Sequence, residues 1–279
     1  MIAISSFVKR YPFVAFVLLN YLLSWSTVIP MHGLLLPWGP MLAALMVVGL
    51  TEGRAGVKAM WNRVIHRGTD LRWYVLAVAI PVAISLTAAA LNVLLGAPVP
   101  QHIDWTTPIR VLPVLLLVSG MWEEPGWTGY ALPQLLQRFT ATPYGAIVAT
   151  LFVAAIRTGW HLPLMIYGHV YWSDILSIIG FQFVLAWLYQ NSRRSVLVVM
   201  LCHLMNNIFV GDFIQQYFVG ADWVRYYWLM AGLWCLLAIG ALVVSGPNLV
   251  RKTVPQSDET AQRDQSRWHK PLQHQDDIG

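Results

Sequence analysis

The chain has 279 residues, of which 57% are hydrophobic and only 11% are charged, and its formal net charge is +5. A soluble domain carries about 25% charged residues, so this composition excludes an ordinary soluble globular protein. The positive charge is spread over short segments instead of forming one stripe, which argues against a nucleic-acid-binding protein. Long apolar runs without a two-residue alternation favour helices over barrel strands. The sequence therefore predicts an all-α, polytopic integral membrane protein.

About eight transmembrane helices are expected, because one span needs about 20 apolar residues. In chain order the expected spans are 12–31, 36–52, 72–97, 108–137, 144–166, 174–190, 195–210 and 225–246. The first run follows Lys9 and Arg10 without a good cleavage site, so we expect it to remain as the first helix. The segment 53–71 is expected to be a basic loop near lipid headgroups. Residues 1–250 then form one helical bundle, and the polar segment 251–279 is expected to be a disordered tail.

The distribution of lysine and arginine predicts the orientation of the bundle. Fifteen of the 18 basic residues fall in segments on the same side as the N-terminus, if the spans alternate. These residues are Lys9, Arg10, Arg54, Lys58, Arg63, Arg67, Arg72, Arg138, Arg193, Arg194, Arg251, Lys252, Arg263, Arg267 and Lys270. Because cytoplasmic segments carry the excess of positive charge, we expect both termini in the cytoplasm. The expected location is the inner membrane of a bacterial cell.

Three clusters of polar residues interrupt the predicted spans. They are MWEEPGWTGY at 121–130, RTGWHLP at 157–163 and CHLMNN at 202–207. An ionisable group within a span costs about 2.5–3.5 kcal/mol on insertion scales, so each cluster is a candidate functional site. The structural alternatives are a helix end facing water, a hydrogen-bonded histidine and polar contacts between helices. Three clusters on three separate helices favour the functional interpretation.

The first two clusters suggest acid–base chemistry. Glu123 and Glu124 are about 100° apart around a helix, so they face different partners, and a buried carboxylate is a candidate general base. Arg157 and His161 are four residues apart and share one helix face. A guanidinium within a span needs a partner, and the first cluster supplies the carboxylates at comparable depth. Gly126 and Gly129, which follow Pro125, are expected to allow close approach of neighbouring helices.

The third cluster suggests an oxyanion-binding pair. His203 is three residues before Asn206 and four before Asn207, so helical spacing does not choose between the two asparagines. Either pair presents two hydrogen-bond donors on one face, which can hold an oxyanion in a dry site.

These clusters resemble those of a known family, the CPBP intramembrane proteases. EEPGW at 123–127, followed by GYALP at 129–133, is similar to the region of the family's EExxxR motif. WHLP at 160–163 is similar to the second motif, HLMNN at 203–207 to the HxxxN motif, and WGPMLAA at 38–44 to an early segment. The resemblance covers about 36–210. The family, also called the CAAX protease and bacteriocin-processing or Abi family, includes the Ras-converting enzyme type of prenyl-protein endopeptidase.

The resemblance implies a hydrolase that performs intramembrane proteolysis on a membrane-associated substrate, such as a prenylated CAAX protein or a leader peptide. It implies that Glu123 and His161 activate water, that His203 and Asn207 hold the oxyanion, and that Glu124 supports the site. The implied partners are this peptide or protein substrate and the lipid bilayer, with no nucleic acid. Two histidines and two glutamates could ligate zinc, but an HExxH motif is absent, so we expect no metal cofactor.

Two positions depart from the family pattern. Thr128 stands where the first motif has arginine, and Arg157 stands where the second motif usually has an aromatic residue. One interpretation is that the charge has moved to a facing helix, where Arg157 pairs with Glu124 and leaves Glu123 as the base. The alternative is that Arg157 extends toward water and contacts neither carboxylate.

Two other functions remain open at this point. A degenerate site would make the protein a catalytically inactive relative with a binding, immunity or regulatory role. A small transporter is the third interpretation, which is disfavoured because we see no internal repeat and the three motifs occur in order.

Overall fold

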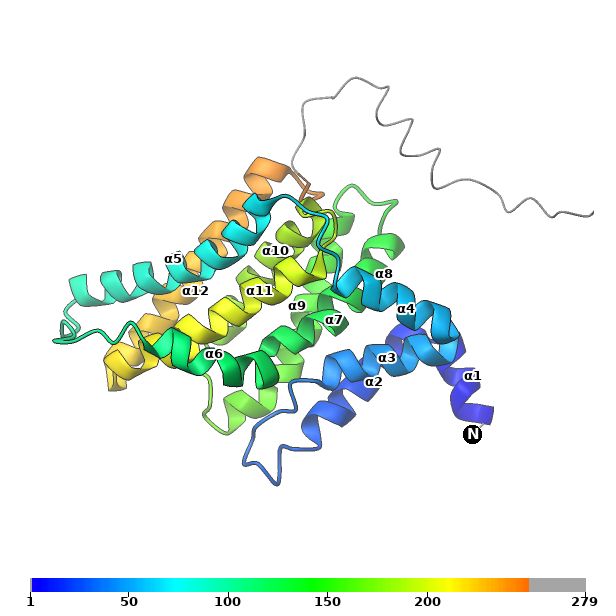
Figure 1. Cartoon of the computed structure of the whole chain (residues 1–279), viewed down its shortest axis with the longest axis horizontal. Helices are drawn as coiled ribbons and strands as arrows, with labels where there is room; N and C mark the ends of the chain where they lie inside the picture. Colours follow the sequence, from blue (N-terminus) through cyan, green and yellow to red (C-terminus); the bar gives the residue numbers. More distant parts are fainter. Residues whose placement is uncertain (1, 251–279) are drawn as a thin grey trace, which may run out of the picture.

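The structure is a computed structural model that describes residues 2–250, with side chains from residue 5 onward. The predicted disordered tail at 251–279 lies outside the described residues. Within residues 2–250 every regular element is helical (Figure 1). This confirms the all-α prediction for that part of the chain.

Long helices alternate with short irregular ones. The α-helices are α1 (Ile2–Arg10), α2 (Pro12–Trp25), α3 (Gly39–Thr51), α4 (Gly53–Val64), α5 (Leu71–Leu94), α6 (Thr107–Val118), α7 (Glu124–Gly126), α8 (Leu132–Arg138), α9 (Gly145–Ile166), α10 (Asp174–Asn191), α11 (Val196–Asn206) and α12 (Gly220–Ser245). The 3₁₀ segments are η1 (Gly120–Glu123) and η4 (Gln215–Tyr217), and the π-helical segments are η2 (Trp127–Ala131) and η3 (Asn207–Ile214).

Four helical stretches are long and apolar enough to cross a bilayer. They are Leu71–Leu94, Gly145–Ile166, Val196–Tyr217 and Gly220–Ser245. The apolar helices α2 and α3 are shorter. The predicted count of eight spans therefore stays a prediction, as does the cytoplasmic location of both termini.

The structure differs from the sequence-based expectations in two segments. The expected span 108–137 is not one helix, because α6 ends at Val118 and Ser119 is extended, with φ −85° and ψ 167°. The chain restarts as η1, where the Ser119 hydroxyl accepts a hydrogen bond from the Met121 amide at 3.4 Å. The expected basic loop 53–71 is mostly the helix α4, whose buried Met60 and Val64 pack into the core.

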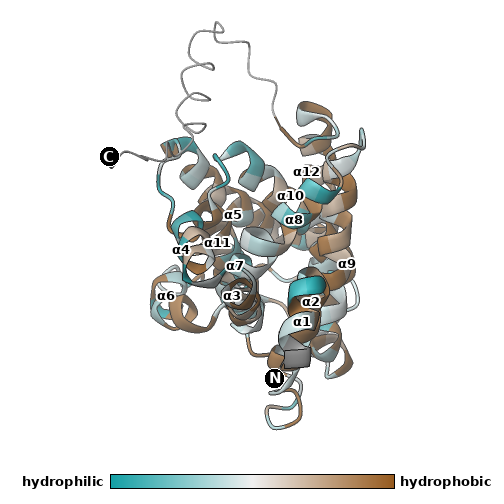
Figure 2. Ribbon diagram, turned by 90° about the vertical axis from the view of Figure 1, so that its right-hand side faces the viewer, coloured by the Kyte–Doolittle hydropathy of each residue, from teal (hydrophilic) through white to brown (hydrophobic). Residues whose placement is uncertain are grey.

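Helix α11 lies at the centre of the bundle and packs against α5, α10, η1 and α7 (Figures 1 and 2). Of the four long apolar stretches, Val196–Tyr217 is accordingly the most enclosed: 61% of its 18-residue apolar part is buried, compared with 28% for Leu71–Leu94. Hydrophobic residues cover the length of α9, whereas hydrophilic ones gather near α4 and α8 (Figure 2). The centre of the bundle is therefore where the polar clusters of separate helices meet.

A glycine fixes the distance between α3 and α7. A Cβ atom at Gly126 would lie 2.4 Å from the backbone of Pro40, so any larger residue would push the two helices apart. This confirms the predicted close approach at Gly126. The same prediction for Gly129 is wrong, because a Cβ atom there would lie 3.5 Å from the Val196 side chain, which is an ordinary contact. Gly126 also anchors the short helix α7, which carries Glu124, against α3.

The predicted orientation can be tested by labelling. In a variant without Cys202 and Cys235, Arg67→Cys should react with a membrane-impermeant maleimide only after permeabilisation, because Arg67 lies in the basic α4–α5 segment. His102→Cys, in the exposed α5–α6 segment, should react in intact cells. Labelling of position 67 in intact cells would contradict the orientation.

Candidate active site

The two adjacent carboxylates lie where η1 meets α7, and both are buried. Glu123 is 5% exposed and Glu124 is fully buried. The break at Ser119 and the π-helical turn η2 frame this short segment on both sides. Single π-helical turns within helices often occur at functional sites, because they redirect side chains that a regular helix would align differently.

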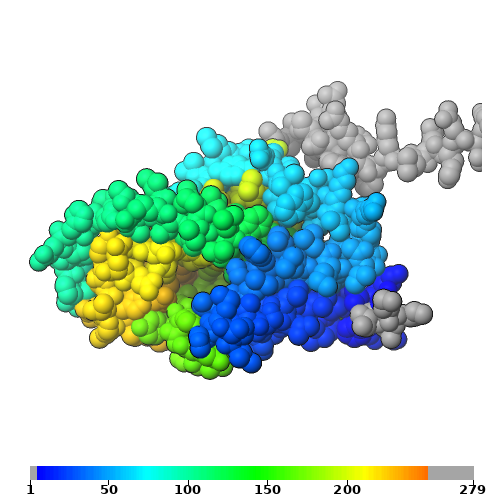
Figure 3. Space-filling view, turned by 60° about the horizontal axis from the view of Figure 1, so that its bottom comes forward, coloured from blue at the N-terminus to red at the C-terminus, as the bar shows by residue number. Residues whose placement is uncertain are grey.

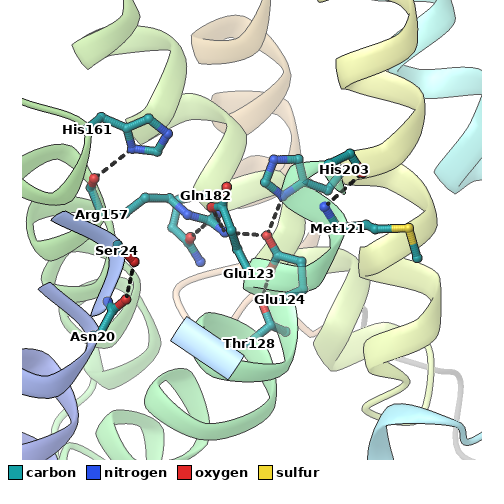
Figure 4. A network of polar contacts seen from close by, with 11 residues as sticks. Asn20, Ser24, Met121, Glu123, Glu124, Thr128, Arg157, His161, Gln182 and His203 are labelled. Carbon is teal, nitrogen blue, oxygen red and sulfur yellow. Dashed lines mark hydrogen bonds and ion pairs between the residues drawn. The ribbon is translucent and has the colours of Figure 1, made fainter. Parts of the chain in front are cut away.

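Glu124 is the centre of a network of polar contacts from four elements (Figure 4). It forms an ion pair with Arg157 of α9. The Nδ1 atom of His203 lies 2.7 Å from Glu124 Oε1, and the Thr128 hydroxyl donates to Oε2 at 2.5 Å. The structure thus contains the predicted Arg157–Glu124 pair, and the alternative in which Arg157 extends toward water is wrong. Thr128 also contacts the carboxylate, at the position where the family motif has arginine.

Arg157 has further partners besides Glu124. Its Nη1 donates to Gln182 Oε1 of α10 at 2.8 Å, and its guanidinium lies 5.7 Å from the centre of the Trp127 ring. Its Nη2 also lies 3.7 Å from Glu123 Oε2. The guanidinium therefore faces both carboxylates. The expectation that Arg157 pairs with Glu124 and leaves Glu123 free is thus met only in part. Gln182 was missed by the sequence analysis, although a glutamine within the apolar run 174–190 was a visible signal.

His161 is oriented by the backbone of its own helix. Its Nδ1 lies 2.8 Å from the carbonyl oxygen of Arg157, one turn earlier in α9. Because a carbonyl only accepts, Nδ1 carries the proton, and in the neutral ring Nε2 keeps its lone pair. His161 Nε2 can therefore accept a proton from a bound water molecule.

His203 and Glu123 face the same small space beside Gly120. A Cβ atom at position 120 would lie 2.4 Å from His203 Nε2 and 2.9 Å from Glu123 Oε1. Gly120 thus allows both groups to approach the backbone of η1. Sequence reasoning missed this role because the need for glycine arises only from the position of a side chain 83 residues away in the chain.

A cavity of about 700 Å³ collects the predicted residues. Its lining includes Glu123, Arg157, His161, His203, Asn206 and Asn207, whereas Glu124 is not part of the lining. Both asparagines line the cavity at the point where α11 passes into η3, and the structure does not choose between them. The Oδ1 atom of Asn206 is buried without a hydrogen-bond partner among the described residues.

The donor groups do not fit a divalent metal ion. Within residues 2–250 no three His, Cys, Asp or Glu side chains are grouped so that they could hold one. The fixed positive charge of Arg157 faces both carboxylates, and His203 Nδ1 is engaged with Glu124. A second cation would meet that charge at short range. A carboxylate and two imidazole nitrogens surround a largely apolar cavity. Such groups can act as general acids and bases in hydrolysis. The expectation of a metal-free mechanism stays a prediction.

Comparison with known proteins agrees with this geometry. Residues 105–209 match the family described as type II CAAX prenyl endopeptidase Rce1-like. The chain is also 24% identical over 143 residues to a protein named CAAX prenyl protease 2 from Methanococcus maripaludis, a match covering 45% of this chain and 51% of the relative. The chain thus spans about half the length of this curated relative. These matches confirm the resemblance to the CPBP, Rce1-like family over the segment that contains all three polar clusters. The similarity to CAAX prenyl endopeptidases thus lies in this segment, and four helical stretches of the described chain are long and apolar enough to cross a membrane.

The energetic role of the Arg157–Glu124 pair can be tested by charge relocation. Arg157→Leu should lower the free energy of unfolding by about 3–5 kcal/mol, because it leaves a buried carboxylate without its cation. Adding Thr128→Arg should restore part of this loss, since an arginine four residues after Glu124 can pair within the helix. Denaturation in detergent micelles measures both effects.

Arg110→Leu is the matched control for this comparison. Arg110 also pairs with a carboxylate, Asp104, but its side chain is 65% exposed. An exposed pair contributes little, so this variant should unfold like the parent. A double variant at positions 157 and 128 that recovers no stability would contradict the relocated-charge interpretation.

Proposed function

We propose that this protein is an intramembrane endopeptidase that hydrolyses a peptide bond of a membrane-associated substrate, in the inner membrane of a bacterial cell. The observation that carries the proposal is the convergence of Glu123, His161 and His203 on one cavity, in a segment similar to a protease family. Residues from three helical segments meet there, and each segment carries one of the three motifs.

Glu123 and His161 are proposed to activate the attacking water. Glu123 Oε2 is buried and accepts no hydrogen bond within the described residues, so it is available to a water molecule. His161 Nε2 faces the same cavity with a free lone pair. As the water oxygen bonds to the substrate carbonyl carbon, its proton passes to this pair. The same proton is then given to the leaving nitrogen as the C–N bond breaks.

His203 and Asn207 are proposed to stabilise the oxyanion of the tetrahedral intermediate. The Asn207 amide is a donor in any state, but His203 already directs Nδ1 at Glu124. His203 Nε2 can donate to an oxyanion only when the ring is protonated. Glu124 balances the charge of that imidazolium, which is how a carboxylate outside the cavity supports the reaction.

The cavity wall favours an apolar substrate segment. Leu34, Leu35 and Trp38 line it from the α2–α3 segment, and Ile178 and Phe181 line it from α10. Apolar walls with a few polar groups bind ligands through burial and orient them through the polar groups. A prenylated CAAX protein, suggested by the name of the matching relative, or a hydrophobic leader peptide would fit this chemistry.

A catalytically inactive relative with a binding, immunity or regulatory role is the second candidate. The 3.7 Å approach of Arg157 to Glu123 favours it, because an ion pair engages the carboxylate that hydrolysis would need to activate water. A cleavage measurement separates this candidate from the first.

The role of Glu123 predicts a large effect of one substitution. Glu123→Gln should lower the rate of peptide release by about 10²–10⁴-fold, because the amide cannot take a proton from water. Fragments released in reconstituted membranes provide the measurement, and Glu52→Gln, at an exposed position outside the cavity, is the control. Turnover close to that of the parent would rule out the assigned role.

The choice between the two asparagines predicts a second difference. Asn207→Ala should lower the rate by about 10²–10³-fold with little change in substrate binding, since an oxyanion donor acts in the transition state. Asn206→Ala, compared in the same assay, should have the smaller effect. If Asn206→Ala has the larger effect, the oxyanion donor is Asn206.

A further inference from the structure

We propose that the catalytic cavity opens on the extracytoplasmic side, so that the enzyme cleaves peptide segments presented from that side of the membrane. The cleavage itself rests on the proposed function. The side of access rests on the geometry of the cavity mouth and on the charges at the two ends of the bundle.

The mouth of the cavity is built from one set of helix ends. Its lining includes Thr27 and Leu34 from the α2–α3 segment, Val170 between α9 and α10, Asp174 at the start of α10, and Asp212 of η3. The space-filling view in Figure 3 shows a hollow between the blue α2–α3 segment, the light-green segment near residue 170 and the yellow η3 region. These segments lie together at the lower end of the bundle in Figure 1.

The basic residues occupy the opposite ends of the same helices. The chain enters α2 from Lys9 and Arg10, Arg138 precedes α9, and Arg193 and Arg194 join α10 to α11. Arg193 donates to the Gly68 carbonyl at 3.1 Å, which ties this turn to the basic α4–α5 segment. Each of the helices α2, α9, α10 and α11 thus runs between a basic end and the end of the bundle where the cavity opens.

The bundle is filled between the catalytic residues and the basic end. Trp127, Leu132 and Val199 are fully buried there. Arg157 lies about 18 Å along α9 from its start, at about 1.5 Å per residue, and His161 lies one turn further toward the mouth. The catalytic groups are therefore reached through the mouth, and the packed core separates them from the basic end.

Charge at the mouth end strengthens this asymmetry. Of the 13 lysine and arginine residues in the described range 2–250, Arg110 and Arg225 lie toward this end. Each is neutralised by a neighbouring carboxylate, Asp104 and Asp222 respectively. Because positively charged ends stay in the cytoplasm, the mouth faces outward.

The outward mouth narrows the class of substrate. A cytoplasmic tail would have to pass the packed core to reach Glu123, whereas a segment in the outer half of the bilayer meets the apolar α2–α3 wall directly. The substrate class is thus a membrane-anchored peptide whose scissile bond lies at the extracytoplasmic side, such as the apolar leader segment of an exported chain.

Labelling from each side of the membrane tests the inference. In a variant without Cys202 and Cys235, Leu34→Cys at the mouth should react with an impermeant maleimide in right-side-out vesicles and not in inverted vesicles. Arg67→Cys, at the basic end, is the matched control and should show the reverse. Reaction of position 34 in inverted vesicles alone would overturn the proposal.

A second measurement separates this inference from the proposed function. Maleimide attached to Leu34→Cys from outside should lower Glu123-dependent fragment release at least tenfold, and maleimide on Arg67→Cys should leave it unchanged. Unaltered release from the labelled Leu34→Cys variant would overturn access through this mouth. An absence of any Glu123-dependent release would contradict the proposed function, while the labelling pattern would still decide which side the mouth faces.

Discussion

The buried ion pair between Arg157 and Glu124 organises the centre of this bundle. A guanidinium and a carboxylate removed from water are stabilised only when their remaining donors and acceptors also find partners. Here Gln182 takes one arginine nitrogen, and His203 and Thr128 contact the carboxylate. The pair therefore fixes the relative positions of α7, α9, α10 and α11, because each supplies a member of the network or lies next to one.

The same network pre-organises the cavity. Orientation of His203 by Glu124 leaves Nε2 beside Gly120, and the Arg157 carbonyl orients His161 in the same way from α9. Under the proposed function, neither ring would have to reorganise when a substrate binds, which is the condition under which fixed dipoles and charges stabilise a transition state. The groups that face the cavity are thus positioned by groups behind it, so Glu124 matters although it does not line the cavity.

The sequence predicted contacts between ionisable residues in apolar segments, but it did not predict local changes of helix type or contacts that depend on the folded geometry. Charges within apolar runs are few, so the partner of Arg157 could be inferred from the small number of carboxylates at its depth. The break at Ser119 and the π-helical turns could not be inferred, because hydropathy averaged over a window does not register a local change of helix type. Gly120 and Gln182 were missed for a related reason: each matters through a contact with a residue distant in the chain, and a single sequence carries no record of that contact.

This chain has Thr128 where the motif that it resembles has arginine, and it has Arg157 on a different helix, which affects how the site is held together. An arginine four residues after Glu124 would pair within its own helix and would not link that helix to another. Arg157 reaches the same carboxylate from α9, so the charge that balances Glu124 also joins two helices. This geometry brings the guanidinium within 3.7 Å of Glu123 as well, yet Glu123 Oε2 accepts no hydrogen bond from the described part of the chain. The two adjacent glutamates thus differ in their environment: Glu124 is buried behind the cavity and engaged by Arg157, His203 and Thr128, whereas Glu123 lines the cavity and its Oε2 has only the more distant Arg157 guanidinium nearby.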